Sequence, residues 1–168
     1  MTANIVHTAW IGLGSNLGDR KDNLERARRS LEKSGNLIKA TSSVYRSPPW
    51  GFESSNHFFN QCIVIETRLM PAKLLALLKQ TEKVYGRDLD GNGYTDRVID
   101  LDILFIDDMV ISHEQLEVPH PRIADRLFVL KPLHEISPSK QHPVLGRTIA
   151  QLLESCTDQG QVERLPAE

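Results

Sequence analysis

The chain is poor in cysteine, has no long apolar segment and carries almost no excess charge. Only two of its 168 residues are cysteines, and neither Cys62 nor Cys156 stands in a CxxC spacing or near a histidine cluster. This pattern argues against a thiolate metal site and indicates buried or incidental thiols. No apolar stretch approaches the ~20 residues that cross a bilayer, and the N-terminus lacks the regions of a leader peptide. We therefore expect a cytoplasmic protein in a reducing compartment.

The charge and size of the chain limit its partners and its organisation. A net charge of −2 and an isoelectric point of about 6.3 provide no global field that would attract nucleic acid or an anionic membrane, so any anion site must be local. With 40% hydrophobic and 25% charged residues, the chain fits one globular domain. We expect that domain to span residues 1–157, and we expect the tail, 158–168, to fray because it has little to bury.

The order of the predicted elements indicates the fold class. Periodicity and turn residues predict strands over 8–13, 37–47, 58–67 and 97–105, helices over 19–34, 71–85 and 148–154, and a last apolar run over 128–133. The first six elements follow the split βαβ pattern of ferredoxin-like α+β folds. This pattern predicts a single-domain antiparallel sheet with both of its helices packed on one face and the other face open. A hairpin turn at Asp107 and Asp108 should follow the last strand.

Two carboxylates interrupt the apolar strand over 97–105. Because side chains alternate along a strand, Asp100 and Asp102 point to the same face, with Cα atoms roughly 6.5 Å apart. The opposite face is apolar, with Ile99, Leu101, Ile103 and Phe105. Two like charges at this distance favour a compensating cation, and hard oxygen ligands suit Mg²⁺. The alternative is that both acids are merely solvated on the wet face of an antiparallel sheet.

Two glycine-rich segments resemble ligand-binding loops but match them poorly. Residues 12–18 have the spacing G-x-G-x-x-x-G, which misses the dinucleotide and Walker A patterns and favours a structural turn and helix cap. Residues 88–96 begin like an EF-hand calcium loop, with D-x-D-x-N-G. The twelfth position is Ile99 instead of a glutamate, and a strand follows instead of a helix. We therefore expect no calcium sensor here.

Cationic and aromatic side chains suggest a site for a polyphosphate beside a flat ring. The cations are Arg87, Arg97, His120, Arg122 and Arg126, which could hold a metal-bound polyphosphate or could form ordinary surface ion pairs. The aromatics Phe58, Phe128 and Trp50 could be core residues or could stack on a planar heterocycle, with Asn60 as a hydrogen-bonding partner. Alternation places Phe58 and Asn60 on one face of their strand.

From Trp10 to Leu153 the chain resembles the 6-hydroxymethyl-7,8-dihydropterin pyrophosphokinase family of the folate pathway. The resemblance is carried by residues 11–18, 42–49, 59–61, 97–102, 118–120 and 126–133, of which Asp-Leu-Asp and Val-Pro-His are the most specific. It implies that pyrophosphate passes from ATP to the hydroxymethyl group of the dihydropterin, that AMP leaves, and that two Mg²⁺ ions assist. The partners it implies are these small molecules, without nucleic acid or a membrane.

The resemblance also implies roles for individual residues. Asp100 and Asp102 are implied as the metal ligands. The implied catalytic residues are these two acids together with Arg87 and Arg97. ATP is implied to contact Glu82, Arg87, Arg97, His120 and Arg126. The pterin is implied to contact Ser47, Pro48, Trp50, Gly51, Phe58, Asn60 and Phe128.

The chain departs from the family's pattern mainly in the loop over 86–96. Relatives commonly carry more basic residues there and a tryptophan before a Pro-Arg pair, whereas this loop is acidic, with Tyr94 and Asp96 near its end. A second hypothesis is therefore a noncatalytic pterin- or calcium-binding module of the same fold. Release of AMP that depends on pterin and Mg²⁺ distinguishes the two.

Overall fold

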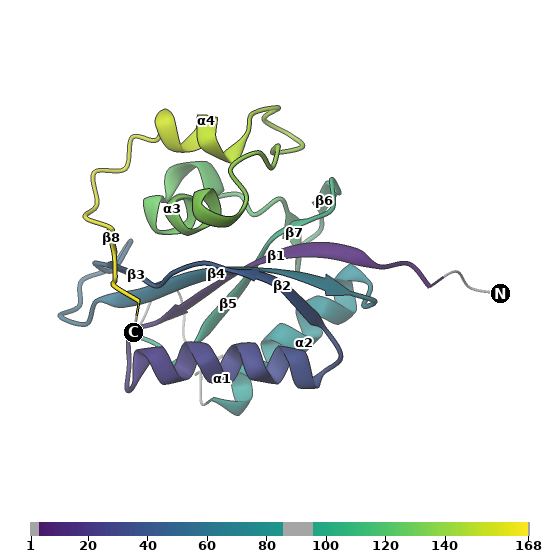
Figure 1. Cartoon of the computed structure of the whole chain (residues 1–168), viewed down its shortest axis with the longest axis horizontal. Helices are drawn as coiled ribbons and strands as arrows, with labels where there is room; N and C mark the ends of the chain where they lie inside the picture. Colours follow the sequence, from purple (N-terminus) through teal and green to yellow (C-terminus); the bar gives the residue numbers. More distant parts are fainter. Residues whose placement is uncertain (1–3, 86–95, 168) are drawn as a thin grey trace.

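The computed structural model describes residues 4–85 and 96–167, and its centre is a six-stranded antiparallel sheet (Figure 1). The strand order is β5-β1-β4-β3-β8, and β2 also pairs with β4. The strands of this sheet are β1 His7–Ser15, β2 Leu37–Thr41, β3 Tyr45–Ser47, β4 Phe58–Thr67, β5 Asp100–Ile106 and β8 Glu163–Arg164. A separate two-stranded sheet joins β6 Ile111–Ser112 to β7 Glu117–Val118. The pairing of β5, β1, β4 and β2 confirms the split βαβ fold.

Helices lie on both faces of the sheet (Figure 1). They are α1 Arg20–Lys33, α2 Pro71–Val84, a short 3₁₀ helix η1 Ile123–Asp125, α3 Leu127–Ile136 and α4 Ile149–Glu154. As predicted, α1 and α2 pack together on one face. The other face is not fully open as expected, because the apolar run over 128–133 forms α3 and packs there with α4. Among the described helices, none has the length and apolar character needed to span a membrane.

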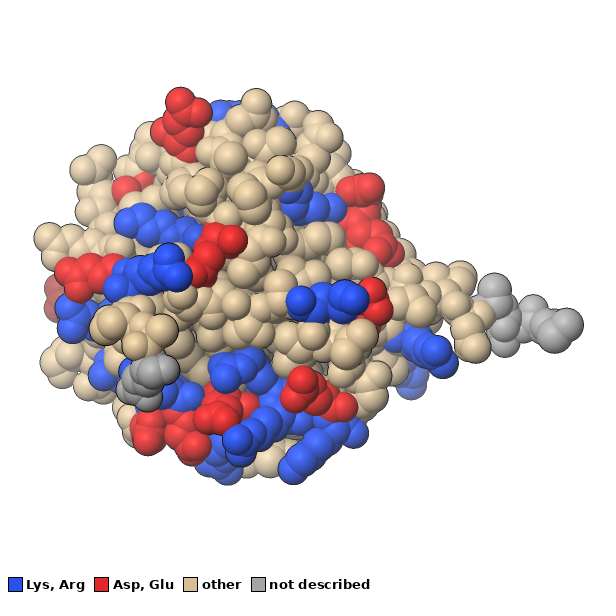
Figure 2. All heavy atoms as spheres, viewed as in Figure 1, with Lys and Arg blue, Asp and Glu red and all other residues tan. Residues whose placement is uncertain are grey.

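The ends and the buried side of α1 follow from its sequence. The side chain of Asp19 caps the first turn by accepting a hydrogen bond from Asp22 N. Leu24, Ala27 and Leu31 are spaced along one side of the helix and are fully buried against the sheet. Figure 2 shows charged side chains of both signs gathered over the lower part of the molecule, where α1 lies. This mixture agrees with the small net charge.

A β-bulge in β5 changes which face two apolar side chains occupy. Ile11 of β1 pairs with Ile103, but Trp10 pairs with Phe105, so β5 contains one extra residue, Leu104. After this residue the alternation resumes on the opposite phase. The prediction that Phe105 shares the face of Leu101 is therefore wrong, since Phe105 packs edge-on against Trp10 under α3 and α4.

The predicted strand over 37–47 is broken in two by a pair of serines. Ser42 keeps its place beside β4 because its backbone N–H donates to Cys62 O and its hydroxyl accepts from Cys62 N. Ser43 instead turns toward α3, where its N–H and hydroxyl both donate to the carboxylate of Glu135. The strand resumes as β3 after this contact.

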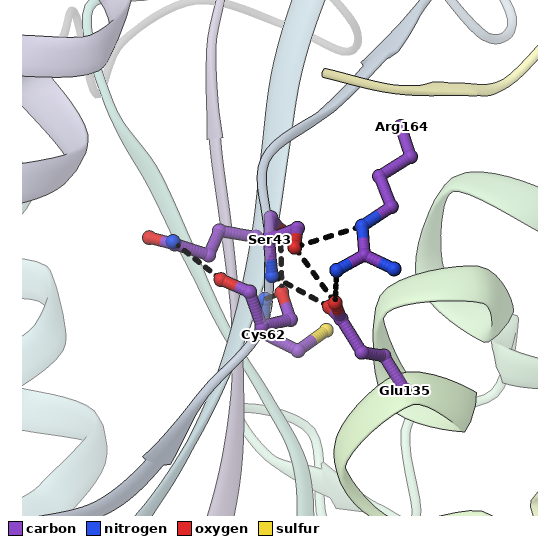
Figure 3. A network of polar contacts seen from close by, with 6 residues as sticks. Ser43, Cys62, Glu135 and Arg164 are labelled. Atoms are coloured by element: carbon purple, nitrogen blue, oxygen red, sulfur yellow. Dashed lines mark hydrogen bonds and ion pairs between the residues drawn. The ribbon is translucent and has the colours of Figure 1, made fainter. Parts of the chain in front are cut away.

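The C-terminal tail packs on the domain, which contradicts the expectation that it frays. Its strand β8 pairs with β3, and Val162 is buried. The carboxylate of Asp158 accepts a hydrogen bond from Leu127 N at the start of α3. Arg164 forms an ion pair of 2.9 Å with Glu135 at the end of α3 (Figure 3). The tail therefore runs the length of α3 and joins that helix to the sheet edge.

The turn at Asp107 and Asp108 forms as predicted, but the chain does not return along β5. Asp107 has a left-handed backbone (φ 48°), and its carboxylate accepts from Thr8 N and lies 2.7 Å from Nδ1 of His7. These contacts hold the turn against β1. The following strand, β6, pairs with β7 instead of forming a hairpin with β5.

Candidate active site

A pocket opens on the α3 side of the sheet, over the middle of β1, β4 and β5. The loop that follows β3 and the start of α3 form its walls. Its lining residues are Gly12, Leu13, Gly14, Ser47, Pro48, Trp50, Phe52, Phe58, Asn60, Gln61, Cys62, Arg97, Asp100, Asp102, Leu104, Arg126, Phe128 and Val129. Both halves of the predicted site therefore border one cavity.

The acid pair lies at one end of this pocket beside a buried arginine. Asp100 and Asp102 both line the cavity and are partly exposed. The guanidinium of Arg97 lies 3.0 Å from Oδ2 of Asp100, and only 9% of its side chain is exposed. Two hydrogen bonds hold the start of this segment in line with β1: Asn16 N donates to Arg97 O, and Arg97 N donates to Oδ1 of Asn16. A cation and two anions are thus fixed side by side at the floor of the pocket.

Two glycines of β1 form the floor between the acids and the amide of β4. Gly12 pairs with Asp102 on one side and Cys62 on the other, and Gly14 pairs with Asp100 and Asn60. A Cβ atom at Gly14 would lie 3.6 Å from the ring of Phe58, and one at Gly12 would lie 3.6 Å from the methyl groups of Leu104. The absent side chains therefore leave the floor bare.

This role of the glycines was missed by the sequence prediction of a structural turn. Gly12 and Gly14 lie within a regular strand, and only Gly18 has the positive φ (72°) of a turn residue. Alternation was the available signal, because Gly12 and Gly14 share a face of β1. That face could be assigned to the pocket only once the register with β5 was known.

The other end of the pocket combines a fixed amide with aromatic rings. Asn60 is 5% exposed, and its Nδ2 donates to Tyr45 O at 3.1 Å and to Ser47 Oγ at 2.8 Å. These bonds direct the amide oxygen toward Gly14. Phe58 lies beside Asn60 and packs edge-on against Phe52, with ring centroids 6.2 Å apart. Phe128 lines the same cavity from α3.

Arg126 connects the aromatic end of the pocket with the charged end. Its guanidinium carbon lies 4.5 Å from the ring centre of Trp50 and 5.6 Å from that of Phe128, and the residue is 7% exposed. These distances are typical of cation–π contacts. A buried cation that also lines a cavity with two carboxylates is suited to an anionic ligand.

His120 is a neutral hydrogen-bond donor beside these charges. Burial and the nearby cations Arg126 and Arg122 lower its pKa to about 4, against the opposing effect of Asp100. Its Nδ1 accepts from Arg122 N at 3.1 Å, which assigns the proton to Nε2. His120 can therefore donate a hydrogen bond at neutral pH without carrying charge.

Of the predicted site residues that the structure describes, Gly51, Glu82 and His120 are not among those that line the pocket. Gly51 is exposed, with φ 83°, and Phe52 lines the pocket in its vicinity instead. Glu82 is fully buried on α2, 3.7 Å from Nζ of Lys79, and does not line the pocket. Arg87 and the calcium-like segment up to residue 95 lie outside the described residues.

The thiol in the pocket floor is not reactive. Cys62 is 1% exposed, and burial together with the charge of Asp102 raises its pKa far above the ordinary value. Both Cys62 and Cys156 are free thiols. This agrees with the prediction of buried or incidental cysteines.

The donor set of the acid pair fits Mg²⁺. Within residues 4–85 and 96–167 there is no group of three or more His, Cys, Asp or Glu side chains that could enclose a metal ion. Asp100 and Asp102 supply two carboxylates on one rigid strand. Mg²⁺ is commonly held by one or two carboxylates and takes its other ligands from water and phosphate, whereas Ca²⁺ needs more protein oxygens.

Comparisons with known proteins agree with these chemical features. A family model described as 7,8-dihydro-6-hydroxymethylpterin-pyrophosphokinase (HPPK) matches residues 10–138. A 2-amino-4-hydroxy-6-hydroxymethyldihydropteridine pyrophosphokinase of Aquifex aeolicus is 39% identical over 84% of this chain and 88% of its own length. The protein of the same name from Bacillus subtilis is 43% identical over 76% of this chain and 77% of its own length.

Longer proteins also contain a counterpart of this chain. A folic acid synthesis protein FOL1 of Dictyostelium discoideum is 37% identical over 97% of this chain, which spans only 24% of that protein. A solved Plasmodium falciparum HPPK-DHPS structure is similar with a TM-score of 0.73, covering 90% of this chain and 44% of the solved chain. At 20% identity, this last similarity shows the fold alone.

Proposed function

We propose how the pocket works from one premise: the chain belongs to the 7,8-dihydro-6-hydroxymethylpterin pyrophosphokinase family. It is an ATP-dependent pyrophosphokinase, which transfers pyrophosphate from ATP to the hydroxymethyl group of 6-hydroxymethyl-7,8-dihydropterin in folate biosynthesis and releases AMP. The alternative of a noncatalytic pterin- or calcium-binding module is not favoured, since relatives named pyrophosphokinases match most of the chain.

The charged end of the pocket binds the phosphates of ATP and two Mg²⁺ ions. Asp100 and Asp102 are the ligands that the chain offers to the metals, and Arg97 holds the phosphates. The ion pair of 3.0 Å between Arg97 and Asp100 supports this assignment, because it keeps a cation beside the acids, where its guanidinium can bind a phosphate. Bound Mg²⁺ supplies positive charge that offsets the charge of the transferring group. Arg87 is assigned to the same phosphates by family resemblance.

Three further residues complete the proposed nucleotide site. Arg126 adds a buried positive charge, and neutral His120 donates through Nε2 to a phosphate oxygen. Glu82 is assigned to the nucleotide pocket by resemblance. Glu82 is fully buried on α2 and does not line the cavity, so this assignment rests on the resemblance alone.

The aromatic end of the pocket binds the pterin ring. Phe58 and Phe128 stack on its two faces, and the amide of Asn60 binds its polar edge. Ser47, Pro48, Trp50 and Gly51 form the surrounding wall. The fixed amide, the neighbouring rings and the bare floor at Gly14 support this assignment, because a flat ring needs exposed π surfaces and a rigid hydrogen-bonding edge.

The observation that carries the proposal is that both ends share one floor. In the strand register, Gly14 lies between Asn60 and Asp100, so a ring held at Asn60 extends its hydroxymethyl group toward the acids. The hydroxyl oxygen then attacks the β-phosphorus in line, the bond to AMP breaks, and the hydroxyl proton is released. Such transfers depend mainly on positioning and neutralisation of charge, so they require no nucleophilic side chain.

Release of AMP tests this assignment. We expect the natural chain to release AMP only when pterin, ATP and Mg²⁺ are all present. Asp102→Asn should lower kcat by at least about a hundredfold, since it removes a charged metal ligand, while the far-UV circular dichroism stays unchanged. Asp108→Asn is the matched control, because Asp108 is an exposed acid at the turn after β5. Normal turnover in Asp102→Asn would remove the metal assignment.

We propose that the partners of the chain are its small-molecule substrates and that it binds neither nucleic acid nor a membrane. We also propose a cytoplasmic location, which is supported by the free thiols of Cys62 and Cys156.

A further inference from the structure

The carboxylate of Asp96 joins two segments that are distant in the sequence. One oxygen accepts from Nδ2 of Asn16 at 2.7 Å, and the other accepts from Nδ2 of Asn56 at 3.1 Å. Hydrogen bonds from Ser54, Asn16 and Asn56, with the charge of Arg97, lower the pKa of Asp96, so it is ionised at neutral pH. Nδ2 of Asn16 also donates to Asn56 O at 3.3 Å. We call these contacts, from Asp96 to Asn16, Ser54 and Asn56, the Asp96 latch.

The residues that Asp96 joins belong to two segments that border different ends of the pocket. Asn56 and Ser54 belong to residues 50–57, the wall segment that carries Trp50 and Phe52. Asn16 is 3% exposed, and its Oδ1 and backbone N bond to the backbone of Arg97. The segment that carries Arg97 therefore has further hydrogen bonds to Asn16. The wall segment is held by the bonds from residues 54–56 to Asn16 and Asp96, by a bond from Arg20 to His57 O, and by the ring contacts of its aromatic side chains.

We propose that Asp96 is a positioning residue, which holds the wall segment over the pterin end of the pocket by anchoring it to the segment that carries Arg97. The expected effect of Asp96 on turnover rests on the proposed function, whereas its expected effect on the mobility of the wall segment does not. Because Arg97 keeps its hydrogen bonds to Asn16, loss of the latch loosens the wall, which its ring contacts and the bond from Arg20 to His57 O still hold in part, and leaves the phosphate side in place.

Kinetics of Asp96 variants test the latch. Asp96→Ala should raise the KM for pterin about tenfold, equivalent to ~1.4 kcal/mol, and leave kcat and the KM for ATP within about threefold. Asp96→Asn keeps one acceptor oxygen and should give an intermediate KM. Asn56→Ala should resemble Asp96→Ala, and the double variant should be no worse than either alone, because both remove the same connection. Asp108→Ala, at an exposed acid with its own ion pair, should change nothing.

Fluorescence provides a second readout that needs no turnover. The chain contains two tryptophans, so Trp10→Phe leaves Trp50 of the wall as the only one. In that background Asp96→Ala should increase the quenching of Trp50 by acrylamide, and Asp108→Ala should not. Unchanged quenching, or a fall in kcat with a normal KM for pterin, overturns the latch. Absence of AMP release by the natural chain instead overturns the proposed function and leaves the quenching result to decide on the latch.

Discussion

Gly14→Ala should separate folding from pterin binding. The new methyl group would lie 3.6 Å from the ring of Phe58 and 3.7 Å from Oδ1 of Asn60, both ordinary van der Waals distances. The fold therefore has room for it. Replacing a strand glycine also removes freedom from the unfolded chain, which stabilises by about 0.4–1 kcal/mol. We expect the melting temperature to stay constant or to rise by about 1–4 °C.

The same methyl group occupies the space in which the pterin ring is proposed to lie. Forcing an extra methyl group into a well-packed contact costs about 1–3 kcal/mol, which corresponds to about a 5- to 150-fold rise in the Kd for pterin. The affinity for ATP should change little, because the phosphates are proposed to bind at the acids and arginines. Titration calorimetry with pterin and with a nonhydrolysable ATP analogue measures both quantities, and thermal denaturation measures the fold.

Gly35→Ala is the reciprocal control. Gly35 follows α1 with φ 91°, and a Cβ atom there would meet no atom of the described residues within 4 Å, so alanine is strained at this position without touching the pocket. It should lower the melting temperature by about 2–4 °C and leave the Kd for pterin unchanged. Normal pterin affinity in a folded Gly14→Ala variant refutes the proposed position of the ring. A Gly14→Ala variant that fails to fold refutes our account of the floor.

Two further predictions concern stability. The pKa of His120 is about 4 in the folded chain and 6.5 as an ordinary value, so between these pH values the unfolded state binds the extra proton. The free energy of unfolding should therefore fall by about 3 kcal/mol as the pH decreases through this window. Urea denaturation in EDTA measures this loss, which should be smaller for His120→Gln. An equal pH slope in both proteins contradicts this. Glu135→Ala should lower the free energy of unfolding by about 1–3 kcal/mol because it leaves Ser43 N–H without its acceptor, whereas Arg164→Ala, which removes a largely exposed partner, should cost at most about 1 kcal/mol. Equal losses in the two variants contradict the importance of the Ser43 contact.

Local sequence rules were sufficient for the elements whose signals lie within themselves. The spacing of Leu24, Ala27 and Leu31 predicted α1 correctly. Strict alternation placed Asp100 and Asp102 on one face of β5, and Phe58 and Asn60 on one face of β4, which was enough to predict a shared site.

The errors arose where the deciding contact comes from a distant part of the chain. The strand over 37–47 is interrupted because Glu135, 92 residues later, binds Ser43. The face of Phe105 depends on a bulge that exists only in the pairing with β1. Asp96 and Asn16 are 80 residues apart, so no window of sequence contains the latch. Long-range pairing of this kind has no periodic signature along the chain.

The construction of the pocket has a consequence for inhibitor chemistry. Its base is the backbone of paired strands, which cannot retreat from a bulkier compound without breaking ladder hydrogen bonds. Residues 50–57, by contrast, lie outside the regular strands. A chemist who enlarges a pterin analogue should therefore add groups toward Trp50 and Phe52, where the protein can adapt, and should keep the portion above Gly12 and Gly14 flat.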